Sequence, residues 1–159
     1  MKVFLSHSSL DKKEYVRDVY ARLKQNSVVY DEATFEAGML AIEEIFKGID
    51  RSSLFVVFLS DSSLSSGWVQ QELAYANDKL TISELERIYP VIIDENICYT
   101  DARIPDWLRN QYNLRLIARP AIASRKIQQR LREVSWSKHP FLKKRKKMFV
   151  GRNSIRANA

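Results

Sequence analysis

Short runs of consecutive apolar residues alternate along this chain with longer stretches in which apolar residues recur every three or four positions. Runs of the first kind predict buried strands, and stretches of the second kind predict amphipathic helices. Strands and helices in alternation are typical of a parallel sheet covered by helices on both faces. We therefore expect an α/β fold of the flavodoxin-like kind, with a parallel sheet of about five strands.

Five runs have the length and composition of strands. They are residues 2–5, 27–30, 54–59, 88–93 and 114–118. The run 54–59, LFVVFL, is the most apolar and is expected at the centre of the sheet. The run 88–93 contains Pro90, which lacks a backbone N–H and therefore favours the start of a strand or a strand at the sheet edge.

Helices are expected between these strands. The apolar spacing places them at about residues 11–25, 42–49, 69–80 and 121–134. Asp11 and Glu14 resemble a capping box at the start of the first helix. The serines between 62 and 66 offer turn and N-cap chemistry before the third. Residues 94–105 are expected to form a loop.

Ligands of open parallel sheets bind at the carboxyl ends of the strands, which here points to the loops 6–10, 31–40 and 60–67. Glu72 lies close to that edge, in the second turn of the helix that follows the central strand. It shares a helix face with Trp68, four residues earlier. A partly desolvated carboxylate there can stabilise a developing cation or accept a proton. Spacing alone favours the simpler interpretation, an exposed glutamate that complements the helix dipole.

The loop 6–11, SHSSLD, offers hydroxyls, an imidazole and backbone N–H groups at a helix start, which suits phosphate or ribose. The same residues Ser8, Ser9 and Asp11 are ordinary helix caps. His7 has no acidic residue nearby in the sequence to orient it, so a catalytic triad is not indicated.

The loop 31–39, DEATFEAGM, contains one aromatic, Phe35, that can either stack on a flat ring or anchor the loop inward. Its acidic residues Asp31, Glu32 and Glu36 argue against a phosphate cradle. The chain contains neither a G-x-x-x-x-G-K-S/T motif nor a G-x-G-x-x-G motif, so the usual signatures of ATP and dinucleotide sites are missing.

The composition limits which classes of protein are possible. The 159 residues, 45% hydrophobic and 28% charged, suit one globular domain without an apolar run of membrane-spanning length. The single cysteine, Cys98, cannot form an internal disulfide, and no Cys/His cluster has metal-ligand spacing. We expect no metal, no membrane span and a cytoplasmic location.

The position of the positive charge bears on nucleic-acid binding. The formal net charge is +7, and residues 143–159 contain seven basic and no acidic residues. Without them, 19 basic residues balance 19 acidic ones. We therefore expect a neutral domain over residues 1–138 and a basic tail or linker over 139–159, with nucleic-acid binding unlikely except through that tail.

Three segments in order resemble a known family: VFLSHSSLDK, VVYDEATFEAGM with the following I-F-K-G-I-D-R-S, and LFVVFLSDSSLSSGWVQQEL. Together they are similar to a Toll/interleukin-1 receptor (TIR) domain of bacterial type. The resemblance implies a flavodoxin-like fold and, in many members, cleavage of NAD⁺ between nicotinamide and ribose. NAD⁺ is then a substrate, and no cofactor is required.

The family's W-x-x-x-E pattern falls on Trp68 and Glu72, which makes Glu72 the candidate catalytic glutamate. By the same matching, Ser6, His7, Ser8 and Ser9 are expected to contact the nucleotide together with Trp68.

The loop 31–39 corresponds to the family's interaction loop, where Asp31 and Phe35 are expected at the substrate. Many relatives carry a tryptophan shortly after the Asp-Glu pair, whereas this chain has Ala33-Thr34-Phe35.

The resemblance also implies partners and context. We expect self-association with other TIR domains to activate the enzyme, and a role in antiphage defence. The segment FVGR at 149–152 resembles the start of NTPase modules in signalling ATPases, although Asn153 stands where an acidic residue is common. We expect either a linker into such a module, with this chain as the N-terminal effector part of a longer protein, or a disordered tail.

Two other functions fit the same fold. One is a non-catalytic TIR scaffold for protein–protein signalling, which would not use Glu72. The other is an enzyme like nucleoside deoxyribosyltransferases, which also uses a glutamate. Release of nicotinamide from NAD⁺ distinguishes the NADase from both.

Overall fold

The computed structural model describes residues 2–23, 28–29, 41–80 and 85–137. The strands are β1 (Val3–Ser6), β2 (Val28–Val29), β3 (Leu54–Leu59) and β4 (Arg87–Ile92). The helical segments are α1 (Ser9–Asp11), η1 (Lys12–Val16, a stretch of π-helix), α2 (Arg17–Arg22), α4 (Ala41–Asp50), α5 (Asp61–Leu64), α6 (Gly67–Lys79), α7 (Asp106–Gln111) and α8 (Pro120–Ser137).

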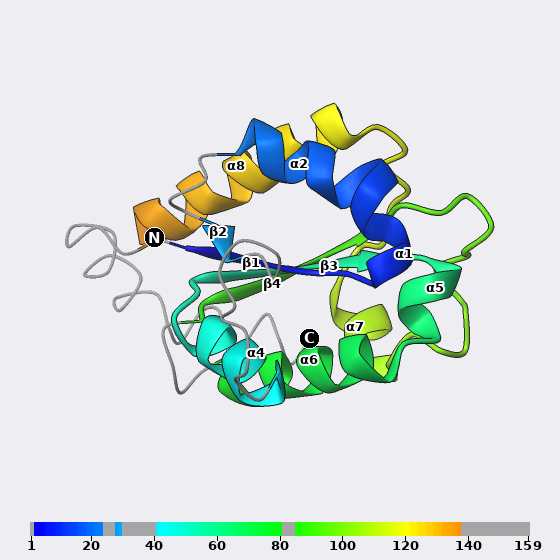
Figure 1. Ribbon diagram of the computed structural model, residues 1–159, viewed down its shortest axis with the longest axis horizontal. Helices are drawn as coiled ribbons and strands as arrows, with labels where there is room; N and C mark the ends of the chain where they lie inside the picture. The colour runs from blue at the N-terminus through cyan, green and yellow to red at the C-terminus, as the bar shows by residue number, and fades with distance from the viewer. Residues whose placement is uncertain (1, 24–27, 30–40, 81–84, 138–159) are drawn as a thin grey trace, which may run out of the picture.

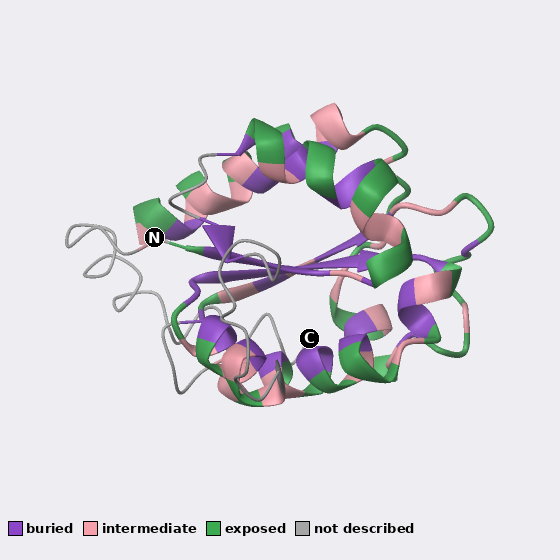
Figure 2. Ribbon diagram, viewed as in Figure 1, coloured by how far each residue is buried: buried purple, intermediate pink, exposed green. Residues whose placement is uncertain are grey.

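All described strand pairs are parallel, and the order in the sheet is β2-β1-β3-β4. The helices α2 and α8 cover one face, and α4 and α6 cover the other (Figure 1). The strands are buried along almost their whole length, while the helices expose their outer sides (Figure 2). The α/β flavodoxin-like fold expected from the sequence is confirmed.

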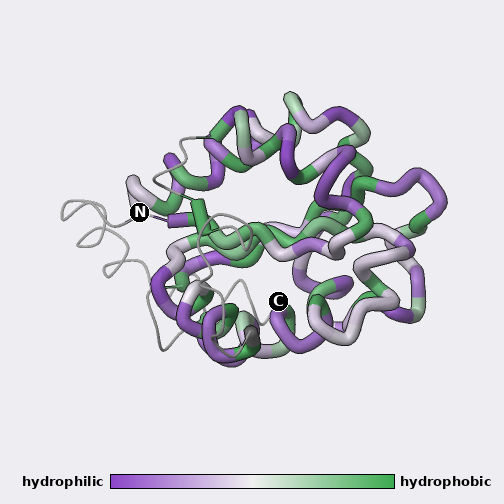
Figure 3. The backbone as a smooth tube through the Cα atoms, viewed as in Figure 1, coloured by the Kyte–Doolittle hydropathy of each residue, from purple (hydrophilic) through white to green (hydrophobic). Residues whose placement is uncertain are grey.

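The central strand β3 divides the core into two layers. Its residues Phe55, Val57 and Leu59 join the cluster on the α4/α6 side, because successive side chains of a strand point to opposite faces. The other three residues of β3 join the cluster on the α2/α8 side. The backbone coloured by hydropathy shows the same apolar strip along the sheet (Figure 3). LFVVFL is therefore the central strand, as the sequence predicts.

The expected fifth strand at 114–118 is reduced to one bridge between Ile92 and Leu116 in the described structure. The Ile92 N–H donates to the Arg115 carbonyl at 3.2 Å, and the Ile117 N–H donates to the Ile92 carbonyl at 2.8 Å. Alternate residues of β4 face this side, so extension of the ladder would next need an N–H from Pro90. Proline has none, which explains both the short pairing and the position of β4 at the sheet edge.

Gly48 allows α4 to lie close against the sheet. A Cβ at this position would lie 2.8 Å from Val29 Cγ1 and 3.2 Å from Phe4 Cε2. Glycine is usually unfavourable inside a helix, by about 1 kcal/mol relative to alanine. Close packing of α4 on β1 and β2 is the reason for it here.

Candidate functional site

The candidate site lies at the carboxyl edge of the sheet, where β1 meets α6. Ser6 is the last residue of β1 and is fully buried. Its hydroxyl donates a hydrogen bond of 2.5 Å to Glu72 Oε2. Two residues 66 positions apart in the sequence therefore form one polar pair.

Glu72 is only 7% exposed, so the interpretation as an exposed glutamate that complements the helix dipole is wrong. The helix that carries it begins after Ser66, whose side chain accepts a hydrogen bond from the Val69 N–H. That cap fixes where α6 starts and so fixes the register of Glu72 against β1. A buried carboxylate is unfavourable unless it is hydrogen-bonded, and Ser6 provides a strong partner.

His7 follows Ser6 and is half-buried. Its Nδ1 lies 2.8 Å from the Leu5 carbonyl oxygen. Because a carbonyl oxygen only accepts, Nδ1 carries the proton in this contact. This contact with the backbone of its own loop orients the ring.

A second polar cluster surrounds Asp11 and joins two loops of the same edge. Ser8 Oγ and Ser60 Oγ both donate to Asp11 Oδ2, at 2.8 and 2.5 Å, and Ser62 Oγ donates to Ser8 Oγ at 2.8 Å. Ser8 is also the N-cap of α1, so the expected Asp11/Glu14 capping box is wrong and the cap lies three residues earlier. The role of Asp11 as a link between loops was missed, because Ser60 is 49 residues away in the sequence.

The other predicted substrate contacts have different positions. Ser9 is exposed at the start of α1, and Trp68 is 52% exposed in the first turn of α6. Asp31 and Phe35 lie outside the described residues. The structure therefore brings Ser6, His7, Ser8 and Glu72 to one edge of the sheet and leaves the aromatic part of the prediction open.

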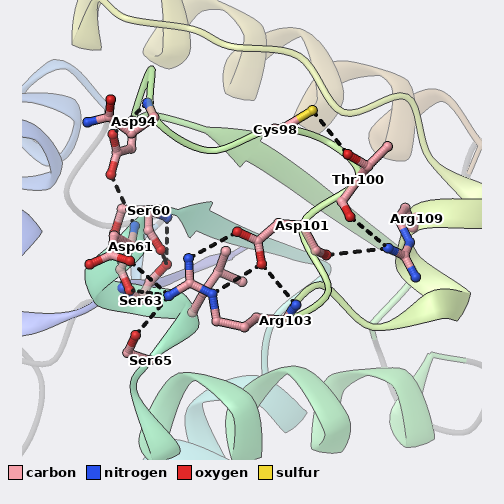
Figure 4. Close-up of polar contacts among 12 residues, drawn as sticks. Ser60, Asp61, Ser63, Ser65, Asp94, Cys98, Thr100, Asp101, Arg103 and Arg109 are labelled. Carbon is pink, nitrogen blue, oxygen red and sulfur yellow. Dashed lines mark hydrogen bonds and ion pairs between the residues drawn. The ribbon is translucent and has the colours of Figure 1, made fainter.

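Residues 94–105 are a loop, as predicted, and it packs against the same edge. Arg103 pairs with Asp101 of the loop and with Asp61 of α5 (Figure 4). The hydrogen bonds from Arg103 hold the pKa of Asp101 below its usual range. The N–H groups of Asn96 and Asp61 do the same for the pKa of Asp94.

A hollow of about 410 Å³ lies beside Asp11 and Ser60. Its lining includes Asp11, Ser60, Asp94 and Glu95, and Glu72 is not part of it. Three carboxylates around one hollow repel the diphosphate of a dinucleotide. The hollow is therefore unsuited to an anionic ligand of this kind.

Within the described ranges, no group of three or more His, Cys, Asp or Glu side chains is arranged to hold a metal ion. Among the same residues, no helix has the length and hydropathy that a membrane crossing needs.

The pair formed by Ser6 and Glu72 can perform electrostatic chemistry. A carboxylate that is fixed in position and shielded from water stabilises a positive charge that develops beside it. It also accepts hydrogen bonds from hydroxyls, such as those of a sugar. Both abilities suit reactions at an anomeric carbon.

Known proteins are similar to this chain in sequence and in fold. A family model described as TIR domain matches residues 3–119. The chain is 42% identical over 81 residues to the NAD(+) hydrolase TirS of Staphylococcus aureus, a match that covers 49% of this chain and 29% of that protein. It is 34% identical over 108 residues to the probable 2' cyclic ADP-D-ribose synthase TcpO of Methanobrevibacter olleyae, covering 65% of this chain and 31% of that protein. The chain thus spans about a third of the length of these relatives.

Solved structures of TIR domains are similar to this chain in fold. The TIR domains of the activated Roq1 resistosome superpose with a TM-score of 0.51 at 26% identity, over 57% of this chain and 56% of that chain. The TIR domain of the Toll-related receptor TRR-2 from Hydra magnipapillata gives a TM-score of 0.60 over 84% of this chain and 97% of that chain. Its 13% identity supports the fold alone. With a family match over residues 3–119, the chain belongs to the TIR domain family.

Proposed function

We propose that this chain is an NAD⁺ glycohydrolase or ADP-ribosyl cyclase that breaks the bond between nicotinamide and ribose. The observation that carries the proposal is the buried carboxylate of Glu72, held by Ser6 at the carboxyl edge of the sheet. Relatives named NAD(+) hydrolase and 2' cyclic ADP-D-ribose synthase support the choice of substrate.

The chemistry follows from the charge of the carboxylate. When the C1′–N bond of NAD⁺ breaks, its electron pair leaves with neutral nicotinamide and positive charge develops on the ribose. Glu72 would stabilise this oxocarbenium-like centre and hold the ribose hydroxyls. Attack by water, with loss of a proton, gives ADP-ribose, and attack by a hydroxyl of the same molecule gives a cyclic isomer.

Self-association is the proposed means of activation. A groove of about 680 Å³ lies between β4 and α8, beside the segment that bridges to Ile92, and Arg115, Arg119 and Lys126 line it. Within the described part of the chain, none of the three forms an ion pair. We propose that the acidic loop 31–39 of a neighbouring copy binds at this basic surface. The TIR domains of the Roq1 resistosome provide a relative that works within an assembly.

The wider setting is also part of the proposal. The domain would work in the cytoplasm as the N-terminal effector of a longer defence protein, with residues 139–159 as the linker to its next module. NAD⁺ depletion or a cyclic nucleotide signal would then limit phage growth.

The test is direct. Concentrated protein is incubated with NAD⁺, and the products are separated by chromatography. We expect nicotinamide together with ADP-ribose or a cyclic isomer. Glu72→Gln, which keeps the shape of the side chain and removes its charge, is expected to lower the rate by about 100-fold or more.

Asp78→Asn is the matched control, because Asp78 is an exposed carboxylate on the same helix. It should keep the wild-type rate. If the wild-type chain releases no nicotinamide even when crowded on beads, the scaffold function replaces the enzyme. Equal rates for wild type and Glu72→Gln would remove Glu72 from the mechanism.

A further inference from the structure

Arg103 connects the loop after β4 to the turn that precedes α6. Its Nε and Nη2 donate to the two carboxylate oxygens of Asp101, at 3.1 and 3.0 Å. Its Nη1 donates to Asp61 Oδ1 at 2.9 Å and to Ser65 Oγ at 3.0 Å (Figure 4). One guanidinium thus contacts three side chains from two segments. Only the planar fork of arginine has the donors for this arrangement.

The two distant partners lie at the two ends of α5. Asp61 is its first residue, and Ser65 follows its last. Ser66, the next residue, is the N-cap of α6, and Glu72 lies in the second turn of that helix. Arg103 therefore holds the segment that sets where α6 begins.

The segment α5 has a second attachment, made by its serines. Ser60, the N-cap of α5, donates to Asp11. Ser62 in α5 donates to Ser8. These bonds tie α5 to Asp11 of α1 and to its N-cap Ser8, while Arg103 ties α5 to the loop after β4. The start of α6 is thus fixed from two directions by loops of the carboxyl edge.

The loop that carries Arg103 is itself held in place. Arg109 Nη1 donates to the carbonyl oxygens of Thr100 and Asp101, at 3.1 and 3.4 Å. Asp94, at the start of the loop, accepts a hydrogen bond of 3.1 Å from the Asp61 N–H. Arg103 consequently contacts α5 from a fixed base, not from a free chain.

We propose that Arg103 is a positioning residue for the reaction of Glu72, and this inference rests on the proposed function. By holding both ends of α5, Arg103 keeps α6 in the register that places the Glu72 carboxylate 2.5 Å from Ser6. A helix transmits a displacement of its first turn to its second, because backbone hydrogen bonds join them. Misplacement of a catalytic group by about 1 Å costs about 100-fold in rate.

We expect the loss of Arg103 to change the position of α6 more than the free energy of unfolding. Arg103 is 37% exposed, and its partners Asp61 and Asp101 are 74% and 19% exposed; ion pairs that water reaches contribute little to the free energy of unfolding. The loss of Arg103 should therefore leave the fold intact and change the alignment of α6.

The experiment measures kcat and KM for NAD⁺ with Arg103→Ala and Arg103→Lys. Arg103→Ala is expected to lower kcat by about tenfold and to change KM by less than about twofold, because the lost alignment acts mainly in the transition state. Arg103→Lys should give an intermediate kcat, since one ammonium group keeps the charge without reaching all three partners. Arg22→Ala is the matched control, because Arg22 forms an exposed ion pair with Asp18 on α2.

Hydrogen exchange provides a readout that does not depend on activity. In Arg103→Ala, the amides of residues 60–72 should exchange faster, and those of α8 should be unchanged. Asp61→Asn should reproduce part of the change, and the double variant should be no worse than Arg103→Ala.

The outcomes separate this inference from the proposed function. A wild-type chain without nicotinamide release contradicts the function, and exchange at residues 60–72 then decides alone whether Arg103 holds α5. An active wild type with unchanged kcat in Arg103→Ala contradicts the positioning role. So does a kcat loss in Arg103→Ala that Arg22→Ala matches.

Discussion

The hydroxyl of Ser6, at the end of β1, contacts the Glu72 carboxylate of α6. Ser6 is fully buried, and its partner Glu72 is 7% exposed. In such surroundings a hydrogen bond to a carboxylate is stronger than one in water, and it fixes the direction of the carboxylate oxygens.

Ser6→Ala should therefore lower the rate of NAD⁺ cleavage by about tenfold while the protein stays folded, because Glu72 loses a partner that orients it. The measurement is the initial rate of nicotinamide release, with the melting temperature as a check on folding. Ser124→Ala is the control, since Ser124 is also buried and its hydroxyl donates within α8, to the Ala121 carbonyl at 2.8 Å. A rate equal to wild type in Ser6→Ala would mean that Glu72 is oriented without Ser6.

At the residue scale, the sequence predicts which residues are candidates for the site but not how far each side chain is buried. Trp68 and Glu72 share a helix face by spacing, yet one is 52% and the other 7% exposed. That difference depends on where β1 passes beneath α6, which is a contact over 66 residues. Arg103 carries no motif at all, and its importance emerges only when Asp61 and Ser65 are brought to it by the fold.

Among the helices, α4 depends on one glycine for its place against the sheet. Gly48→Ala would improve helix propensity by about 1 kcal/mol but would press a methyl group against Val29 Cγ1, 2.8 Å away. Val29 sits in a strand and is stiff at χ1, so it has little room to move. Overpacking of this kind costs about 1–3 kcal/mol, and the net effect should be a lower free energy of unfolding.

Thermal unfolding of Gly48→Ala tests this packing argument. We expect a fall in Tm of several degrees, about 2–6 °C. A rise in Tm would show that α4 can move away from β1 and β2 without loss.

Elements with strong local patterns were predicted well. The central strand 54–59 matches β3 in both bounds, and the amphipathic stretch at 121–134 became the longer helix α8. The sequence does not predict α7, because Leu108 is the one buried residue among the six of this helix. A single buried position cannot show a helical periodicity. The strand expected at 114–118 failed for a non-local reason, since its ladder is stopped by Pro90 on the neighbouring strand.

Across the whole molecule, charge is separated although its sum over the domain is close to zero. Residues 110–137 contain six basic residues and one acidic residue, Glu133. On the opposite face of the sheet, α4 has three acidic residues and one basic residue (Figure 1). The domain is therefore neutral in sum, but its positive and negative charges lie on different faces. Opposed charges on opposite faces favour association of copies in one orientation.

Lys126→Glu should weaken self-association more than Lys13→Glu, although both change the net charge by the same amount. Lys126 lines the groove beside β4, whereas Lys13 is exposed in η1. Sedimentation of concentrated protein at several salt concentrations provides the measurement. Association of the wild type should fall as salt rises, because screening shortens the reach of surface charges to about 8 Å at physiological ionic strength. Equal association of the two variants would exclude the groove as the contact.

Pro90 has a consequence for how copies of this molecule can meet. A free strand edge normally invites another chain to add to the sheet through main-chain hydrogen bonds, and stacks built in this way are hard to take apart. At the outer edge of β4 a proline interrupts the row of donors. Copies that gather at this edge must therefore recognise one another through side chains, so contacts made there can be released again instead of growing into a fibre.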